Sequence, residues 1–145
     1  EISACLVGSE MCIREGSLIN NRYVLTAAHC IDVKALRPRW SLTSVRLGEW
    51  NTESDTDCDE SFINDKVCND PPIDVAIERK ILHESYNAKD KSNRNDIGLL
   101  RLAESVTYSN FIRPICLPID ESLRNFNFVG KTLSVSGWGE LEIFN

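Results

Sequence analysis

The chain has 145 residues, of which 42% are apolar and 26% charged, so it can form one folded domain and should not be largely disordered. Its net charge of -6 argues against a nucleic-acid-binding protein, which is usually basic. No apolar run approaches the ~18 residues of a membrane span, and the first residues lack the basic and apolar stretches of a signal peptide.

Short β-rich runs separated by turn residues begin near residue 17. Runs at 17–19 and 23–27 flank Asn20-Asn21-Arg22, and adjacent asparagines tolerate positive φ, so we expect a tight hairpin there. One helical turn is expected after His29, around residues 31–36.

The later runs continue this pattern. Residues 44–48 alternate and end at a glycine, residues 73–82 are rich in β-branched side chains, and residues 97–102 are mostly apolar. Residues 131–136 alternate again before Gly-Trp-Gly. Regularly spaced short strands, without a persuasive amphipathic helix, predict an all-β barrel or sandwich.

The longest polar stretch, residues 51–72, is acidic and ends in two prolines that disfavour a strand. It contains Cys58 and Cys68, whose spacing suits a local disulfide on a long surface loop. Closing even a short loop can stabilise a protein by roughly 2–3 kcal/mol through the unfolded state.

The chain contains six cysteines, an even number that fits three disulfides formed in an oxidising compartment. No two of them form a Cys-x-x-Cys pair, so their spacing does not indicate a zinc site. Six buried thiols in a reducing compartment are the alternative. The cysteines are Cys5, Cys12, Cys30, Cys58, Cys68 and Cys116.

Three motifs occur in a fixed order along the chain: LTAAHC at 25–30, NDIGLLRL at 95–102 and SGWG at 136–139. Together they resemble the trypsin/chymotrypsin family of serine proteases. The resemblance implies an all-β fold with a six-stranded antiparallel barrel, the first half of the two-barrel chymotrypsin-like fold. This barrel would occupy residues 16–139, after an atypical segment at 1–15, and residues 140–145 would begin the second half.

The resemblance gives roles to His29 and Asp96. A serine hydroxyl needs a base within hydrogen-bond reach, and a histidine can take up and return its proton. His29 would be this base, and Asp96 would orient the imidazole and stabilise the imidazolium. Outside these motifs a lone histidine is more often structural or exposed, and an aspartate can merely cap a turn. The implied activity is that of a serine endopeptidase that requires no cofactor.

Finer features, at 20–25, 45–50 and 113–118, resemble the arthropod clip-domain proteases. Those enzymes act in extracellular zymogen cascades of innate immunity and development, so the resemblance implies a secreted enzyme whose partner is a protein substrate or zymogen. Cys116 resembles the cysteine that ties the catalytic domain to a disulfide-linked regulatory light chain. Without that light chain, Cys116 would be unpaired or would bond Cys5.

The sequence departs from the family pattern in three places. Arg14 stands where the family has the partner of Cys30, and Cys12 lies two residues earlier, so a Cys12–Cys30 bond needs a backbone shift. There is no Ile-Val-Gly-Gly start and no Gly-Asp-Ser-Gly-Gly-Pro motif, which carries the nucleophile. We therefore expect the 145-residue chain to be inactive alone, because losing one triad member typically costs about 10⁴-fold in turnover.

Two other functions fit the same residues. The parent protein could be a catalytically dead homologue that acts as a binding cofactor, which the residue at the nucleophile position would reveal. The chain could also be a non-functional fragment, because half a protease exposes the apolar face that packs on the second barrel.

The acidic loop carries a possible calcium site. The family includes members that hold Ca²⁺ in this loop, and carboxylate, amide and carbonyl oxygens suit that ion. Glu49 and Asn51 align with ligand positions of those relatives, and Asp74 is a third candidate. The alternative is a solvated acidic loop without a metal.

Overall fold

The computed structural model of the chain describes residues 4–7, 15–32, 41–52, 54, 56–59 and 67–132. Within these residues, six strands pair antiparallel into a closed barrel in the order β1-β2-β3-β8-β7-β4. The strands are β1 (Ala4–Val7), β2 (Glu15–Asn20), β3 (Tyr23–Thr26), β4 (Ser44–Leu47), β7 (Ile73–Leu82) and β8 (Gly98–Leu102). The predicted all-β class is confirmed.

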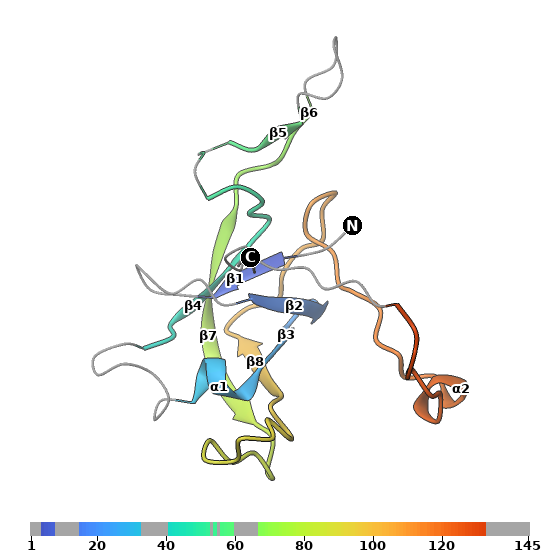
Figure 1. Cartoon of the computed structure of the whole chain (residues 1–145). Helices are drawn as coiled ribbons and strands as arrows, with labels where there is room; N and C mark the ends of the chain where they lie inside the picture. Colours follow the sequence, from blue (N-terminus) through green and yellow to red (C-terminus); the bar gives the residue numbers. More distant parts are fainter. Residues whose placement is uncertain are drawn as a thin grey trace, which may run out of the picture.

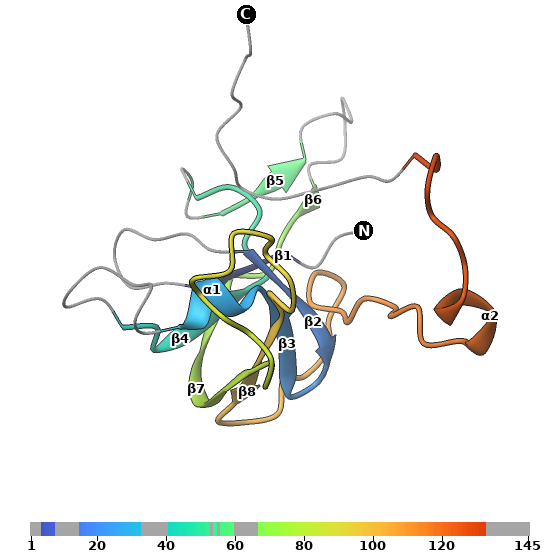
Figure 2. The same cartoon turned by 60° about the horizontal axis from the view of Figure 1, so that its bottom comes forward.

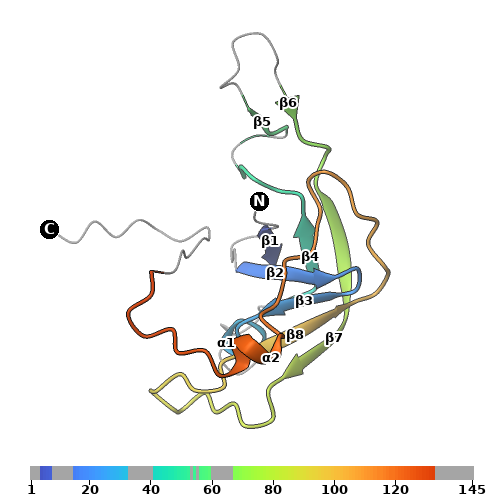
Figure 3. The ribbon, with the colours of Figure 1, turned by 90° about the vertical axis from the view of Figure 1, so that its right-hand side faces the viewer.

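Four smaller elements lie outside the barrel sheet in the described part of the chain. β5 (Cys58–Asp59) and β6 (Val67–Cys68) form a separate two-stranded ribbon, which projects from one end of the barrel in Figures 1 and 3. The short helix α1 (Ala28–Ile31) follows β3 directly. A second turn of helix, α2 (Glu121–Arg124), lies apart from the barrel in Figures 1 and 2.

Alternating side chains of the strands fill the barrel. Burial along β8 follows a strict inside–outside pattern, since successive side chains of a strand point to opposite faces. Burying each large apolar side chain contributes about 1.5–3 kcal/mol relative to leaving it exposed. The largest fully buried side chains are Leu18, Val24, Ile31, Val45, Leu47, Leu100 and Leu102.

The β2–β3 hairpin forms where it was predicted, but not for the predicted reason. Among the described non-glycine residues, positive φ occurs at Asn93 and Asn95 and not in this turn. Instead, the side-chain oxygen Oδ1 of Asn20 accepts a hydrogen bond of 2.9 Å from the backbone N–H of Arg22. An asparagine can shape a turn in this way without a left-handed backbone.

Other predicted elements agree in part with the structure. The runs at 44–48 and 73–82 become β4 and β7, and Gly48 has a φ of 79° where β4 ends. The helix α1 begins at Ala28 and contains His29. Of the turn predicted around residues 31–36, Ile31 ends α1, Asp32 is not helical, and residues 33–36 lie outside the described residues. Of the run at 131–136, residues 131–132 are not in a strand; the remainder and the SGWG motif lie outside the described residues.

Candidate active site

Strand pairing explains how residues far apart in sequence meet at one end of the barrel. β3 and β8 are antiparallel neighbours, with Thr26 opposite Gly98. His29 comes three residues after Thr26, and Asp96 comes two residues before Gly98. Both therefore lie at the same end of the two strands, where Figure 2 shows α1 beside the connection between β7 and β8.

Gly98 lets α1 approach β8 closely. A Cβ atom built at this position would lie 2.6 Å from Cδ1 of Ile31 and 3.2 Å from the carbonyl oxygen of Ile81. Real Cβ atoms essentially never come within 3.0 Å of another heavy atom, so a larger residue here would force the end of the Ile31 side chain to move. The glycine therefore allows Ile31 of α1 to pack directly on β8.

Two hydrogen bonds join His29 to Asp96. The ring nitrogen Nδ1 lies 2.7 Å from Oδ2 of the carboxylate, and the backbone N–H of His29 donates to Oδ1 at 2.8 Å. The Asp96 side chain is 18% exposed, whereas the His29 side chain is 54% exposed. The carboxylate is thus held within the protein, and the imidazole faces outward.

The surroundings of Asp96 favour its ionised form. Burial alone would raise the pKa of this carboxyl, but hydrogen bonds from the His29 backbone and ring, with a further one from the Ala28 backbone, hold the pKa below its ordinary value. Asp96 is therefore a carboxylate at neutral pH. It can fix the imidazole tautomer and stabilise an imidazolium.

The other ring nitrogen of His29 contacts a thiol. Sγ of Cys30 lies 3.4 Å from Nε2, and Cys30 is a buried, free cysteine. The phenol of Tyr86 lies near these groups. Burial raises the pKa of the phenol most, and the charges of Asp96, Asp32 and Cys30 raise it further. The ring nitrogen that does not face Asp96 therefore lies beside the Cys30 sulfur.

A histidine paired with a partly buried carboxylate is the arrangement that the sequence motifs predicted. The family model described as Trypsin matches residues 6–145. The chain belongs to the trypsin family. Among the described residues, no helix is both long and apolar enough to cross a bilayer.

The relatives of this trypsin-family chain include clip-domain proteases, as the sequence resemblance indicated. Serine protease ea of Drosophila melanogaster is 50% identical over 127 residues, which cover 88% of this chain and 32% of that protein. CLIP domain-containing serine protease HP8 of Bombyx mori is 44% identical over 127 residues, with 88% and 33% covered. The chain spans about a third of the length of the curated relatives it matches.

A solved structure supports the same fold. The Drosophila Grass clip serine protease of the Toll pathway is 37% identical, with a TM-score of 0.69 over 85% of this chain and 34% of that chain. The described strands of this trypsin-family chain therefore form one part of a chymotrypsin-like fold.

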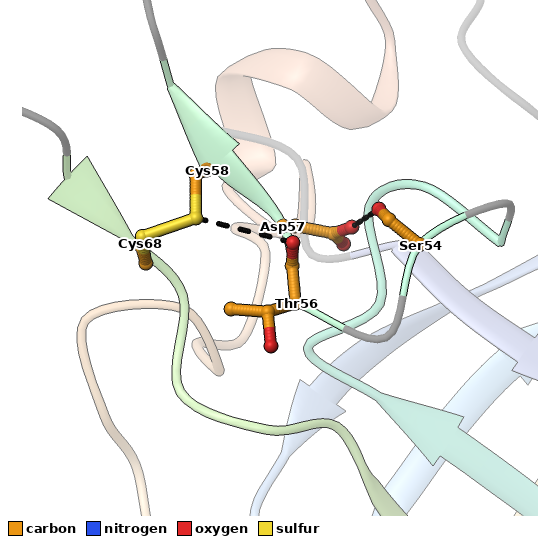
Figure 4. Close-up of a disulfide and its surroundings, with 5 residues drawn as sticks. All are labelled: Ser54, Thr56, Asp57, Cys58 and Cys68. Atoms are coloured by element: carbon orange, nitrogen blue, oxygen red, sulfur yellow. Dashed lines mark hydrogen bonds between the residues drawn. A yellow bond between two sulfur atoms is a disulfide. The ribbon is translucent and has the colours of Figure 1, made fainter.

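The cysteines of the trypsin-family chain can be placed in part. Cys58 and Cys68 form the predicted disulfide across the β5–β6 ribbon (Figure 4). Cys30 and Cys116 are free thiols, the first buried and the second exposed. Cys12 lies outside the described residues, and the side chain of Cys5 is not described.

The acidic loop before this disulfide is organised by Asp57, a residue that the sequence did not single out. Its buried carboxylate accepts hydrogen bonds of 2.8 Å from the backbone N–H groups of Trp50 and Asn51. Ser54 donates its hydroxyl to the second oxygen at 2.7 Å, as Figure 4 shows. Asp57 stood among other acidic residues, and no spacing rule distinguishes it from them.

Glu49 and Asp57 face each other as two buried carboxyl groups. Burial, the negative charge of Asp57 and a hydrogen bond with Asp57 raise the pKa of Glu49. Burial acts against ionisation of Asp57 as well, but hydrogen bonds from Ser54 and the backbone lower its pKa overall. Glu49 is therefore the carboxyl of the pair that holds the proton more strongly.

Asp74, the third predicted calcium ligand, has a different partner. It lies opposite Arg46 in the β4–β7 pairing, and both of its oxygens accept hydrogen bonds of 2.9 Å from the guanidinium. The same guanidinium lies 3.8 Å from Glu49. Within the described ranges, no three or more His, Cys, Asp or Glu side chains are grouped so that they could hold a metal ion.

Proposed function

We propose that this chain supplies the general base and its orienting carboxylate to a serine endopeptidase. The observation that carries the proposal is the 2.7 Å contact between Nδ1 of His29 and Oδ2 of Asp96, at the end of two paired strands. In this proposal the six strands are the first of the two barrels of a catalytic domain. The serine nucleophile would come from outside residues 1–145, because this sequence has no Gly-Asp-Ser-Gly-Gly-Pro motif.

The proposed mechanism follows from the different roles of the two ring nitrogens of His29. With a proton on Nδ1, the ring donates to Asp96 and leaves the lone pair of Nε2 free to accept a proton. The serine hydroxyl would take the place beside Nε2 that the Cys30 thiol has in this structure. Nε2 removes the hydroxyl proton as the oxygen attacks the peptide carbonyl, and later returns it to the leaving amine. Asp96 stabilises the imidazolium between these two steps.

The biological setting is proposed from the relatives. They include proteins named Melanization protease 1 and Spaetzle-processing enzyme of Drosophila melanogaster, at 47% and 44% identity. We infer that this chain belongs to a secreted protease that cleaves a protein substrate or zymogen in an extracellular cascade. The Cys58–Cys68 disulfide supports an oxidising compartment. The exposed thiol of Cys116 suits the disulfide-linked light chain.

A calcium ion in the acidic loop is a further proposal. Glu49 and Asp57 would hold it with Asn51, because two adjoining buried carboxyls repel each other when both are ionised and a cation removes that repulsion. Asp74 suits the ion less well, since the guanidinium of Arg46 already neutralises its negative charge, whereas the hydrogen-bond donors to Asp57 are uncharged. Millimolar Ca²⁺ should raise the unfolding midpoint relative to EDTA, and Glu49→Gln should remove that shift. Equal unfolding midpoints in Ca²⁺ and in EDTA would contradict the calcium site and support a solvated acidic loop without a metal.

The peptidase proposal is tested on the full-length protein that contains this chain. His29→Ala should reduce peptide hydrolysis by roughly 10⁴-fold or more. His83→Ala is the matched control, because His83 is exposed and its ring accepts a hydrogen bond from the nearby Ser85 backbone N–H, away from Asp96. Full-length protein that folds, binds partners and hydrolyses nothing would instead support the binding cofactor.

A further inference from the structure

The carboxylate that faces His29 is carried by a tight turn just before β8. The backbone N–H of Ile97 donates to the carbonyl oxygen of Asn95 at 2.8 Å, and this hydrogen bond closes a γ-turn with Asp96 at its centre. Asn95 has a φ of 58°. A left-handed backbone is uncommon outside glycine, and asparagine is one of the few other residues that tolerate it. Asn95 therefore sets the direction in which the backbone enters Asp96.

The side chain of Asn95 ties this turn to the chain that leaves β7. Its amide Nδ2 donates to the carbonyl oxygen of Ser85 at 3.2 Å, across ten residues of sequence. By contrast, the side chains of Asn87 and Asp90 in the same loop accept backbone N–H groups two residues away. The Asn95 amide thus links the two limbs of the loop.

The carbonyl that accepts this amide lies in a turn that is itself fixed to the start of β8. The backbone N–H of Tyr86 donates to the His83 carbonyl at 3.0 Å, and the His83 backbone N–H donates to the Ile97 carbonyl at 3.1 Å. Both bonds use backbone atoms of His83, which an alanine would keep. Ser85 lies inside this turn, so its carbonyl is a fixed acceptor. The Asn95 side chain closes a ring of hydrogen bonds that includes the backbone on both sides of Asp96.

The other side of Asp96 is joined to α1. Its carboxylate accepts the backbone N–H of His29 at 2.8 Å and lies 2.7 Å from Nδ1 of the imidazole. Hydrogen bonds weaken steeply when donor and acceptor are misaligned. A small displacement of a catalytic group lowers the rate even when its cause lies outside the reacting atoms. Whatever fixes the γ-turn therefore also fixes the direction of the His29 ring.

We propose that Asn95 is a positioning residue, whose amide bond to the Ser85 carbonyl holds Asp96 in the orientation that directs the His29 imidazole. This inference rests on the proposed peptidase function. Asn95 acts through Asp96 and not on the substrate, so loss of its amide should lower kcat and leave KM nearly unchanged. An exposed hydrogen bond between neutral groups contributes modestly, so we expect kcat to fall by about 3- to 10-fold.

Two glycine variants of the full-length protein isolate the effect of the amide. Asn95→Gly removes the amide, and glycine tolerates the φ of 58°. Asn93→Gly is the matched control, because Asn93 is exposed in the same loop with a φ of 53°, and its side chain forms no hydrogen bond with the described residues. Both changes free the unfolded chain to a similar extent. We expect the lower kcat in Asn95→Gly alone, with KM within about twofold in both variants.

A spectroscopic signature tests the positioning without relying on hydrolysis. The proton between Nδ1 of His29 and Asp96 gives a far-downfield NMR resonance while that hydrogen bond is short, and His29→Ala identifies the resonance by removing it. The resonance should move upfield or broaden in Asn95→Gly and stay in place in Asn93→Gly. A resonance that is the same in the two variants, or changed equally in both, overturns the proposal. If the wild-type protein hydrolyses no peptide, the peptidase proposal fails, and the resonance still decides whether Asn95 positions Asp96.

Discussion

Asp96 and Glu49 are both carboxyl groups largely shielded from solvent, Asp96 at the end of the barrel that holds His29 and Glu49 beside the acidic loop. Asp96 faces an imidazole and backbone N–H groups, and its pKa is lowered although burial opposes this. Glu49 faces another carboxyl, and burial and that negative charge raise its pKa. Burial penalises ionisation in both places, so the partner decides which protonation state the fold keeps.

The largest change in the free energy of unfolding is expected from a substitution in β8, the barrel strand that follows Asp96. Leu100→Ala removes a fully buried side chain from β8 and should lower the free energy of unfolding by about 2–5 kcal/mol. Ile119→Ala, at a side chain that is 70% exposed, is the control and should change it by less than about 0.5 kcal/mol. Equal effects in denaturant titrations would show that β8 is not part of the core.

The acidic loop depends more on its crosslink than on a core. Replacing Cys58 and Cys68 together by alanine should cost about 2–3 kcal/mol in the free energy of unfolding. Peptide hydrolysis by the folded full-length protein should stay within a few-fold, since the ribbon projects away from the barrel. A loss of activity without a loss of stability would mean that the two regions are coupled.

The contributions of Asp96 and Glu49 to the free energy of unfolding should depend on pH in opposite directions. Both are measured in EDTA. The lowered pKa of Asp96 gives stability that is present above its unfolded value near 3.9 and is lost as pH falls through the folded pKa. The raised pKa of Glu49 acts in reverse, with stability present below its unfolded value near 4.3 and lost as pH rises through the folded pKa. At pH 7, Asp96→Asn should therefore destabilise by about 1.5–3 kcal/mol, and Glu49→Gln should be neutral or stabilising by up to about 1 kcal/mol.

Both differences should fade as the pH is lowered to 3, because wild-type Asp96 and Glu49 are then increasingly protonated. A Glu49→Gln variant that is clearly less stable than wild type at pH 7 in EDTA would contradict the assignment of the proton to Glu49.

The exposed cross-strand pair should show the smallest effect. Arg46 and Asp74 form two hydrogen bonds, but both side chains are about half exposed, so solvent screens their attraction. A double-mutant cycle with alanine at each position should give a coupling energy of about 0.2–1 kcal/mol, smaller at high salt. A coupling above 2 kcal/mol would show that the pair is shielded from water.

The sequence predicted those parts of the site that lie in contiguous motifs. His29 and Asp96 could be assigned because each stands in a motif beside a barrel strand, and strands β4 and β7 followed from alternation and β-branched residues. Asp57 could not be found, because its role depends on how the loop folds its carboxylate onto two backbone N–H groups. The partner of Asp74 could not be found either, since alternation gives the face of a strand but not its register with the next strand.

The most direct test of the account is the rate of peptide hydrolysis by full-length protein with Asp96→Asn, which keeps the shape of the side chain but removes its charge. We predict that kcat falls by about 10⁴-fold with little change in KM, while the fold is retained. A variant that hydrolyses the peptide within a few-fold of the wild-type rate would contradict the claim that Asp96 orients His29 for catalysis.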